Sequence, residues 1–436
     1  MAEMLSEDAF IRYKLRVELA LVTVLCRLGL CDQAVVDEVA EACVHVTTEE
    51  VYVEEDKTKH DIRAMVNCIQ RRVSERSRPF VHLGATSYDI VDTANACRYR
   101  DAVLQVLVPA LIGLESVLIE ITEREASTLQ IGRTHGQHAV PITVGFAIAE
   151  YVDRLGTSIV ELRQRASQLP GKFSGAVGAY NASSLFFDDP RQFEAEVLKE
   201  LGLEPLNHST QIAQPEPMVR MISEIITACG VMANLADDMR NLQRTEIGEV
   251  GEEFQSDQVG SSTMPQKRNP INFENAKSVW KVAMPRMITV YMDQISEHQR
   301  DLTNSASGRT LGEIIAYAGE IATRLKRTMF KLNVDQGNLD ANLAKSQGGV
   351  LAEPMYLILA SLGHPDAHEA VKQMTLLAAS TSKTLSEVFA ENAELDSYRQ
   401  RLTEEQKRIM SNPAEYTGRA AERAIAVTSH WRRQLA

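Results

Sequence analysis

The sequence is poor in aromatic residues and cysteine. Phe, Trp and Tyr make up 6% of the 436 residues, and segments that alternate β-branched and polar residues are almost absent, which disfavours a fold built on β-sheets. The six cysteines form no CxxC pair and no His/Cys spacing typical of a zinc site. We therefore expect reduced, mostly buried thiols and no bound metal.

The sequence also has no excess of basic charge and no long apolar run. Lys and Arg number 46 against 59 Asp and Glu, a net charge of −13, so we expect no nucleic-acid partner. The N-terminal residues MAEMLSEDAF do not resemble a targeting signal, and no apolar run approaches the ~18 residues that span a bilayer. We expect a cytoplasmic protein with no membrane partner, in which a local basic cluster holds any anionic ligand.

Apolar residues recur at steps of three and four over long stretches, which is typical of helices buried on one face. A seam of leucines runs from Leu104 to Ile121, with Glu115 lying off it. Pro109 is expected to kink this helix without cancelling its period. A second seam, residues 218–242, would cover about 36 Å of helix.

These seams predict an all-α fold with a central bundle of long helices. Rods of this length need a partner for their apolar face, in a subunit interface or in a purely intramolecular bundle. Gly, Pro and small polar residues interrupt the pattern at several places. We place an N-terminal helical domain at 1–88, the long-helix bundle at 89–333 with a polar loop at 251–270, and a C-terminal helical domain at 334–436.

Residues 260–270, GSSTMPQKRNP, differ from their helical surroundings. Small residues leave backbone N–H groups free to point at an anion, while Lys267 offers a charge and Asn269 an amide. The segment is either a carboxylate-binding loop or an exposed connector, since long loops are commonly functional or disordered.

A second polar segment, RTHGQH at 133–138, lies between apolar residues. His135 and His138 could face one ligand if they were on a helix, but no third ligand completes a metal site. Acid-base chemistry is favoured over zinc, with a structural role for His138 as the alternative.

Three further clusters combine charge and hydroxyl groups. His60 is followed by Asp61, and Thr86 and Ser87 precede a long helix, where they could bind an anion or simply cap the helix. Residues 300–309 bring together two arginines and several hydroxyls, which suits a phosphate or carboxylate but also an ordinary solvated helix face.

Taken together, these segments resemble the fumarase/aspartase superfamily, whose signature GSSxMPxKxNP is matched at every fixed position by residues 260–270. Within it the chain is similar to the adenylosuccinate lyases. The motifs that carry this likeness are HD at 60–61, HLGATSxD at 82–89, GRTHGQHAxPIT at 132–143, TQI at 210–212, TEIGEV at 245–250 and RDLTNSxxxR at 300–309.

The resemblance implies a lyase that cleaves a bond β to a carboxylate and releases fumarate without metal or organic cofactor. It makes Ser261 the general base, His135 the general acid and Glu274 the carboxylate that orients His135. Proton removal next to a carboxylate creates a dianion, so Lys267, Asn269 and loop amides would stabilise the developing charge. A serine is a poor base at neutral pH, so the loop would have to close around it.

The implied substrates are adenylosuccinate, cleaved to AMP and fumarate, and SAICAR, cleaved to AICAR, in purine biosynthesis. Arg300, Ser305 and Arg309 would help to hold the nucleotide part. The resemblance assigns substrate contacts to ten residues: His60, Asp61, Thr86, Ser87, Thr134, Gln211, Asn269, Arg300, Ser305 and Arg309.

Similar proteins are homotetramers in which each active site takes motifs from three chains. His60, His135 and Ser261 should then lie far apart within one chain and close together in the assembly. The Arg-Tyr segment that usually precedes the first helix has no counterpart here, because Arg12 and Tyr13 are expected inside that helix. This departure concerns substrate specificity and leaves the lyase chemistry unaffected.

Three alternatives remain. The first is a related lyase acting on a smaller succinyl-amine substrate, such as an argininosuccinate-like compound. The second is a 3-carboxymuconate cycloisomerase-like enzyme, which typically lacks the histidine found here at His135. The third is a non-catalytic structural protein like some lens crystallins, disfavoured because Ser261, His135 and Lys267 are all present.

Overall fold

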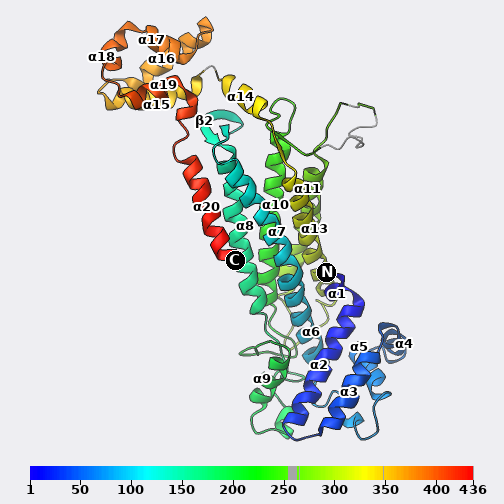
Figure 1. Cartoon of the computed structure of the whole chain (residues 1–436). Coiled ribbons are helices and arrows are strands. Elements are labelled where there is room, and N and C mark those ends of the chain that lie inside the picture. Colours follow the sequence, from blue (N-terminus) through cyan, green and yellow to red (C-terminus); the bar gives the residue numbers. More distant parts are fainter. Residues whose placement is uncertain (254–262, 265, 347, 436) are drawn as a thin grey trace. The chain divides into compact units, whose positions relative to one another are not determined.

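The computed structural model describes residues 1–253, 263–264, 266–346 and 348–435. Within them the regular secondary structure is helical apart from two small antiparallel pairs of strands, so the predicted all-α fold is confirmed (Figure 1). All six cysteines are free thiols.

The chain divides into two compact units, each made of three stretches. Unit 1 comprises Met1–Leu111, Thr157–Gly230 and Ser278–Ala322, and unit 2 comprises Ile112–Gly156, Val231–Lys277 and Thr323–Ala436. Every boundary falls inside a helix. The three-domain division proposed from the sequence remains a prediction.

Unit 1 contains the N-terminal helices, and its core lies where α2 packs against α3, α6 and α9. The elements of this unit are α1 (Ala2–Leu5), α2 (Glu7–Arg27), α3 (Gln33–His45), α4 (Thr48–Thr58), α5 (Asp61–Gln70), α6 (Ser87–Ala102), α9 (Pro190–Glu200) and α12 (Arg286–Met292). Five helices have residues in both units: α7 (Val108–Arg124), α8 (Val144–Ser167), α10 (Glu216–Leu242), α11 (Ile271–Ala283) and α13 (Leu311–Phe330).

Unit 2 contains both strand pairs and the C-terminal helices. Its elements are β1 (Leu129–Thr134), β2 (Gln137–Thr143), β3 (Val250–Gly251), β4 (Asn333–Val334), α14 (Gln336–Ala344), α15 (Ala352–Ser361), α16 (Ala367–Thr381), α17 (Leu385–Glu391), α18 (Asp396–Arg399), α19 (Glu404–Ser411) and α20 (Ala420–Leu435). Ile131 of β1 is buried in the apolar core formed by α15–α17 and α19, so this core anchors the β1–β2 hairpin.

The two apolar seams form helices as predicted. The second seam coincides with α10, whose buried residues include Ile222, Ile225 and Cys229. The first seam runs from α6 into α7 through a π-helical turn, Val103–Leu107, that lies just before Pro109. Proline cannot donate a backbone hydrogen bond to the residue four positions earlier, and the wider turn accommodates that loss while the helix continues.

Two helical stretches are long and apolar enough to cross a membrane by length and composition, Ser87–Arg124 and Glu216–Leu242. In each, 56% of the most apolar window is buried within the protein. Core helices of globular bundles have the same character, so these stretches are accounted for by packing.

Candidate active site

A cavity of about 610 Å³ in unit 1 brings together six of the residues singled out from the sequence. They come from the start of α5, the start of α6, and the segment that leads into α13. The six residues are His60, Asp61, Ser87, Arg300, Ser305 and Arg309.

The imidazole of His60 is oriented by two contacts. His60 is the N-cap of α5, and its Nδ1 accepts a hydrogen bond from the backbone N–H of Arg63 at 3.3 Å. Because Nδ1 acts as an acceptor, the neutral ring carries its proton on Nε2, which lies 3.2 Å from the Ser87 hydroxyl. His60 therefore presents a donor towards Ser87 in the cavity wall.

Asp61 is shared between the cavity and the core of unit 1. Its carboxylate accepts a hydrogen bond from the buried Lys14 ammonium at 2.9 Å. Burial raises the pKa of Asp61, but the charge and hydrogen bond of Lys14, together with smaller contributions from the Ile62 backbone and His60, outweigh burial and lower the pKa of this carboxyl group. Asp61 is thus ionised and already paired with Lys14. It is better suited to holding the segment that carries His60 than to reacting with a substrate.

The start of α6, with Thr86 and Ser87, is fixed by a buried ion pair. Thr86 is the N-cap, and its backbone N–H donates to the Asp89 carboxylate at 2.8 Å. The other oxygen of Asp89 accepts from Lys172 at 2.5 Å, and both side chains are fully buried. Breaking such a pair leaves an uncompensated charge in the core, so this end of α6 is held in one position.

Arg300 is held between an aromatic ring and an amide. Its guanidinium lies 3.5 Å from the centre of the Tyr88 ring and donates to the Gln211 side-chain oxygen at 3.2 Å. Gln211 does not itself line the cavity, whereas the next residue, Ile212, does. Gln211 is linked to the cavity through its hydrogen bond with Arg300. Arginine has five donors and the contact with Gln211 uses one of them, so Arg300 can hold Gln211 and bind an anionic ligand at the same time.

Sequence reasoning missed Tyr88 and Asp92, which also line the cavity. Burial raises the pKa of Asp92 to about 6, although its carboxylate accepts a hydrogen bond from the Ala213 backbone at 2.7 Å. Neither residue carries a signal in sequence, because an isolated Tyr or Asp on a helix is ordinarily a surface residue.

The second group of predicted residues lies in unit 2, where His135 occupies the tip of the β1–β2 hairpin. Thr134 pairs with Gln137, which leaves His135 and Gly136 as the two turn residues, with φ of 54° and 73°. Two positive φ angles in a two-residue loop define a type I′ turn, the form that suits the twist of a hairpin. The turn exposes His135 and Thr134 to solvent. His135 and His138 therefore do not lie on a helix, and the condition for their facing one ligand as helical neighbours is not met.

The remaining predicted residues belong to the signature loop and the helix after it. Ser261 lies outside the described residues. Lys267 is exposed and its backbone N–H closes a turn on Met264 O at 3.0 Å, while Glu274 is exposed in the first turn of α11. Within the described part of the chain, no hydrogen bond or ion pair joins Glu274 to His135, so the predicted orienting contact is not seen within this chain.

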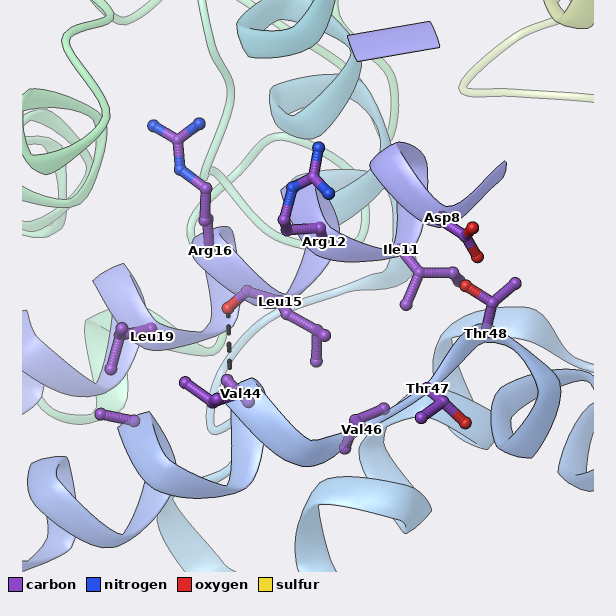
Figure 2. Close-up of a pocket in the computed structure, with 12 residues that line it drawn as sticks. Asp8, Ile11, Arg12, Leu15, Arg16, Leu19, Val44, Val46, Thr47 and Thr48 are labelled. Carbon is purple, nitrogen blue, oxygen red and sulfur yellow. Dashed lines mark hydrogen bonds between the residues drawn. The ribbon is translucent and has the colours of Figure 1, made fainter. Parts of the chain in front are cut away.

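Unit 1 contains another cavity, of about 500 Å³, along α2 and the start of α4 (Figure 2). Figure 2 shows Arg12 and Arg16 extending from α2, with Thr47 and Thr48 across the groove. Arg12 and Tyr13 lie within α2, as expected from the sequence. No predicted site residue lines this groove.

Comparisons with known proteins relate the chain to lyases. Residues 13–284 match the family described as lyase, and residues 296–416 match the family described as adenylosuccinate lyase C-terminal. The chain is 36% identical to an adenylosuccinate lyase of Pyrococcus horikoshii, over 86% of this chain and 83% of the relative. It is 33% identical to an adenylosuccinate lyase of Archaeoglobus fulgidus, over 97% and 94%.

A solved structure also resembles the chain over its whole length. It is a 3-carboxy-cis,cis-muconate lactonizing enzyme from Pseudomonas putida, with a TM-score of 0.87 and 26% identity, covering 100% of this chain and 97% of that one.

Proposed function

Because the chain belongs to the fumarase/aspartase superfamily of lyases, as an adenylosuccinate lyase-like member, we propose that it cleaves the C–N bond of an N-succinyl nucleotide and releases fumarate. The preferred substrate is adenylosuccinate, which yields AMP, and the second substrate is SAICAR, which yields AICAR. The observation that carries the proposal is the unit 1 cavity, where five predicted site residues with charged or polar side chains line one space: His60, Ser87, Arg300, Ser305 and Arg309.

The cavity suits a polyanionic ligand despite the acidic balance of the chain. Arg300 and Arg309 supply two guanidinium groups, a geometry that matches phosphate or carboxylate oxygens. His60 and Ser87 add neutral hydrogen-bonding groups to the same wall. The lining also contains Lys59 and Arg98, and five carboxylates, those of Glu55, Asp61, Asp92, Asp293 and Asp301. The arginines would therefore bind an anion through directed hydrogen bonds rather than through an excess of positive charge.

The elimination removes a proton from one succinyl carbon and breaks the C–N bond of the neighbouring carbon. Ser261 takes a proton from the succinyl carbon next to a carboxylate, the electron pair forms the fumarate double bond, and the C–N bond breaks. His135 donates its proton to the departing nitrogen, with Glu274 as its orienting carboxylate. Lys267 and Asn269 stabilise the dianionic intermediate, because donors already in place act most strongly where charge develops.

The assembly proposed for this chemistry is a homotetramer with shared active sites. Exposed apolar side chains on and after α12 support it, since such surface is normally covered in a stable protein. Ile288, Met292, Ile295 and Leu302 are between 63% and 78% exposed in the single chain. We further propose that the protein is soluble and works in the cytoplasm on a small-molecule substrate.

The test is fumarate release by the purified wild-type protein from a panel of substrates. Adenylosuccinate and SAICAR should be cleaved much faster than argininosuccinate or simple N-succinyl amines. Because a carboxymuconate lactonizing enzyme shares the fold, 3-carboxymuconate belongs in the panel. Cyclisation of that compound without fumarate release from any succinyl substrate would overturn the proposal.

A further inference from the structure

The hairpin that carries His135 consists of only two strands, and an isolated hairpin of this size is marginally stable in water. Its strand β1 is anchored by Ile131 in the C-terminal core. Just beyond that apolar anchor, the register of the two strands shifts between Ile131 and Arg133, so the pairing is irregular towards the end of the hairpin. A second anchor close to His135 is therefore needed to fix the imidazole.

The carboxylate of Glu249 accepts four hydrogen bonds next to strand β1. Its side chain is fully buried and forms a two-pronged ion pair with Arg133, at 3.0 Å to Nη1 and 2.5 Å to Nη2. The same carboxylate accepts from the Gln130 amide at 2.9 Å, so two residues of β1 bind to one buried group. Paired contacts of this kind set the direction of the guanidinium as well as its position.

The carboxylate also ties the hairpin to α14. The Asn342 amide donates to Glu249 Oε1 at 2.8 Å, and Lys345 donates to the Asn342 oxygen at 2.7 Å. The backbone oxygen of Glu249 accepts from Asp335 at 2.9 Å. Glu249 is thus the one described carboxylate that bonds both to β1 and to the helix that begins the C-terminal part of unit 2.

Glu249 also lies three residues before Glu252, which holds the start of α11. The Glu252 carboxylate accepts from the backbone N–H groups of Asn272 and Phe273 at 2.8 and 3.0 Å. Glu274 is in the first turn of that helix. The short segment around β3 therefore supports both the hairpin of His135 and the helix of Glu274.

From these contacts we infer that Glu249 is a positioning residue for the acid step. It fixes Arg133, two residues before His135, and so holds the hairpin tip in the orientation that delivers the proton to the leaving nitrogen. This inference rests on the proposed function, because it requires His135 to be the general acid. Glu249 touches no reacting atom in this scheme, and its effect passes through Arg133.

The test substitutes Glu249→Gln, which keeps the shape of the side chain and removes its charge. We expect kcat to fall about 100-fold, the size of effect that a small misplacement of a catalytic group produces, while KM changes little. Glu249→Asp, which keeps the charge but shortens the reach, should give an intermediate kcat. The matched control is Glu115→Gln, because Glu115 is equally buried in unit 2 but has no hydrogen-bond partner among the described residues, and the kcat of this variant should equal that of the wild type.

The pH profile separates positioning from a purely structural role. Glu249→Gln leaves Arg133 and Lys345 as uncompensated positive charges acting on the hairpin, which already act on His138. Positive charge disfavours a protonated imidazole, so the alkaline limb of the kcat profile should move to lower pH. Glu115→Gln should leave that limb in place.

Two results would decide against the inference. A folded Glu249→Gln variant with wild-type kcat and an unmoved alkaline limb would overturn it. If that variant does not fold, Arg133→Lys takes its place, since lysine keeps the charge and loses the two-pronged contact, and an unchanged kcat there would overturn it equally. Failure of the proposed function has a different signature, which is no fumarate release by the wild type or full activity of His135→Ala.

Discussion

The residues predicted to bind substrate and those predicted to perform the chemistry differ in how they are held. In unit 1, Ser87 and Arg300 contact neighbouring side chains that line the same cavity or lie next to it. In unit 2, His135, Lys267 and Glu274 are exposed. The β1–β2 hairpin carries His135, and the first turn of α11 carries Glu274. Ser87 and Arg300 are therefore held by contacts with other side chains. His135 and Glu274 are exposed side chains whose positions are set by the hairpin and the helix that carry them.

This difference predicts different kinetic effects for the two groups. Substitutions in the cavity should weaken binding, because they remove contacts that substrate and transition state share. Substitutions of the outward groups should slow the chemical step, because their contacts strengthen only as charge develops.

The largest effect is expected for the acid and the base. His135→Ala and Ser261→Ala should each lower kcat by about 10²–10⁴-fold, since that is the usual contribution of a positioned acid or base. KM should stay within a few-fold of the wild-type value, as both residues act mainly in the transition state. Steady-state fumarate release measures both constants, and a loss of less than about tenfold in kcat would remove that residue from the mechanism.

An intermediate effect is expected for Arg300. Arg300→Ala should raise KM by roughly 10–100-fold, because a charge-assisted contact to an anion in a cavity is lost. Arg300→Lys should recover only part of this, since lysine lacks the planar group that stacks on Tyr88 and reaches Gln211. The same assay checks both variants, and an unchanged KM with a reduced kcat would contradict the division between binding and chemistry.

The smallest effect on activity, and a clear one on stability, is expected for Glu115. Burial raises the pKa of Glu115 to about 9, and the charge of Asp153 adds to the shift. The folded chain keeps a proton that the unfolded chain releases above its ordinary pKa of 4.5, so the free energy of unfolding falls as pH rises from 4.5 towards 9. The carboxylate of Glu249 is equally buried but differs from that of Glu115, because it accepts four hydrogen bonds.

Denaturant unfolding at about pH 6 and about pH 8 measures this slope. Glu115→Gln should flatten it, and Glu115→Met should stabilise the protein by about 1–3 kcal/mol, because it also removes two unpaired buried oxygens. Equal slopes for the wild type and Glu115→Gln would show that Glu115 is not the group responsible.

The sequence was sufficient to predict the long apolar helices and six of the residues that line the cavity. The seam of α10 repeats at helical steps over its full length, and such long periodic signals are hard to mistake. His60, Ser87 and Arg300 stood out because charged residues and hydroxyl groups cluster around them in the sequence, and the structure places them around one cavity.

The hairpin and its support could not be predicted in the same way. Strand β1 contains only six residues, and its turn uses His135 where glycine or asparagine usually gives the signal. Glu249 looks like an ordinary surface glutamate, because only the fold brings Arg133 and Asn342 to it. Glu115 lies off the leucine seam and is nevertheless fully buried, since a helix packed on several sides has no solvent face.

The most direct test of the account mixes two inactive chains. His60→Ala lacks a cavity residue and should bind substrate weakly, and His135→Ala lacks the acid, so at a low concentration of adenylosuccinate each variant alone should release fumarate very slowly. When the two are produced together with different tags and purified as mixed oligomers, a shared site that takes His60 and His135 from different chains should regain a substantial part of wild-type turnover. Mixed oligomers that remain as inactive as either parent would contradict the account.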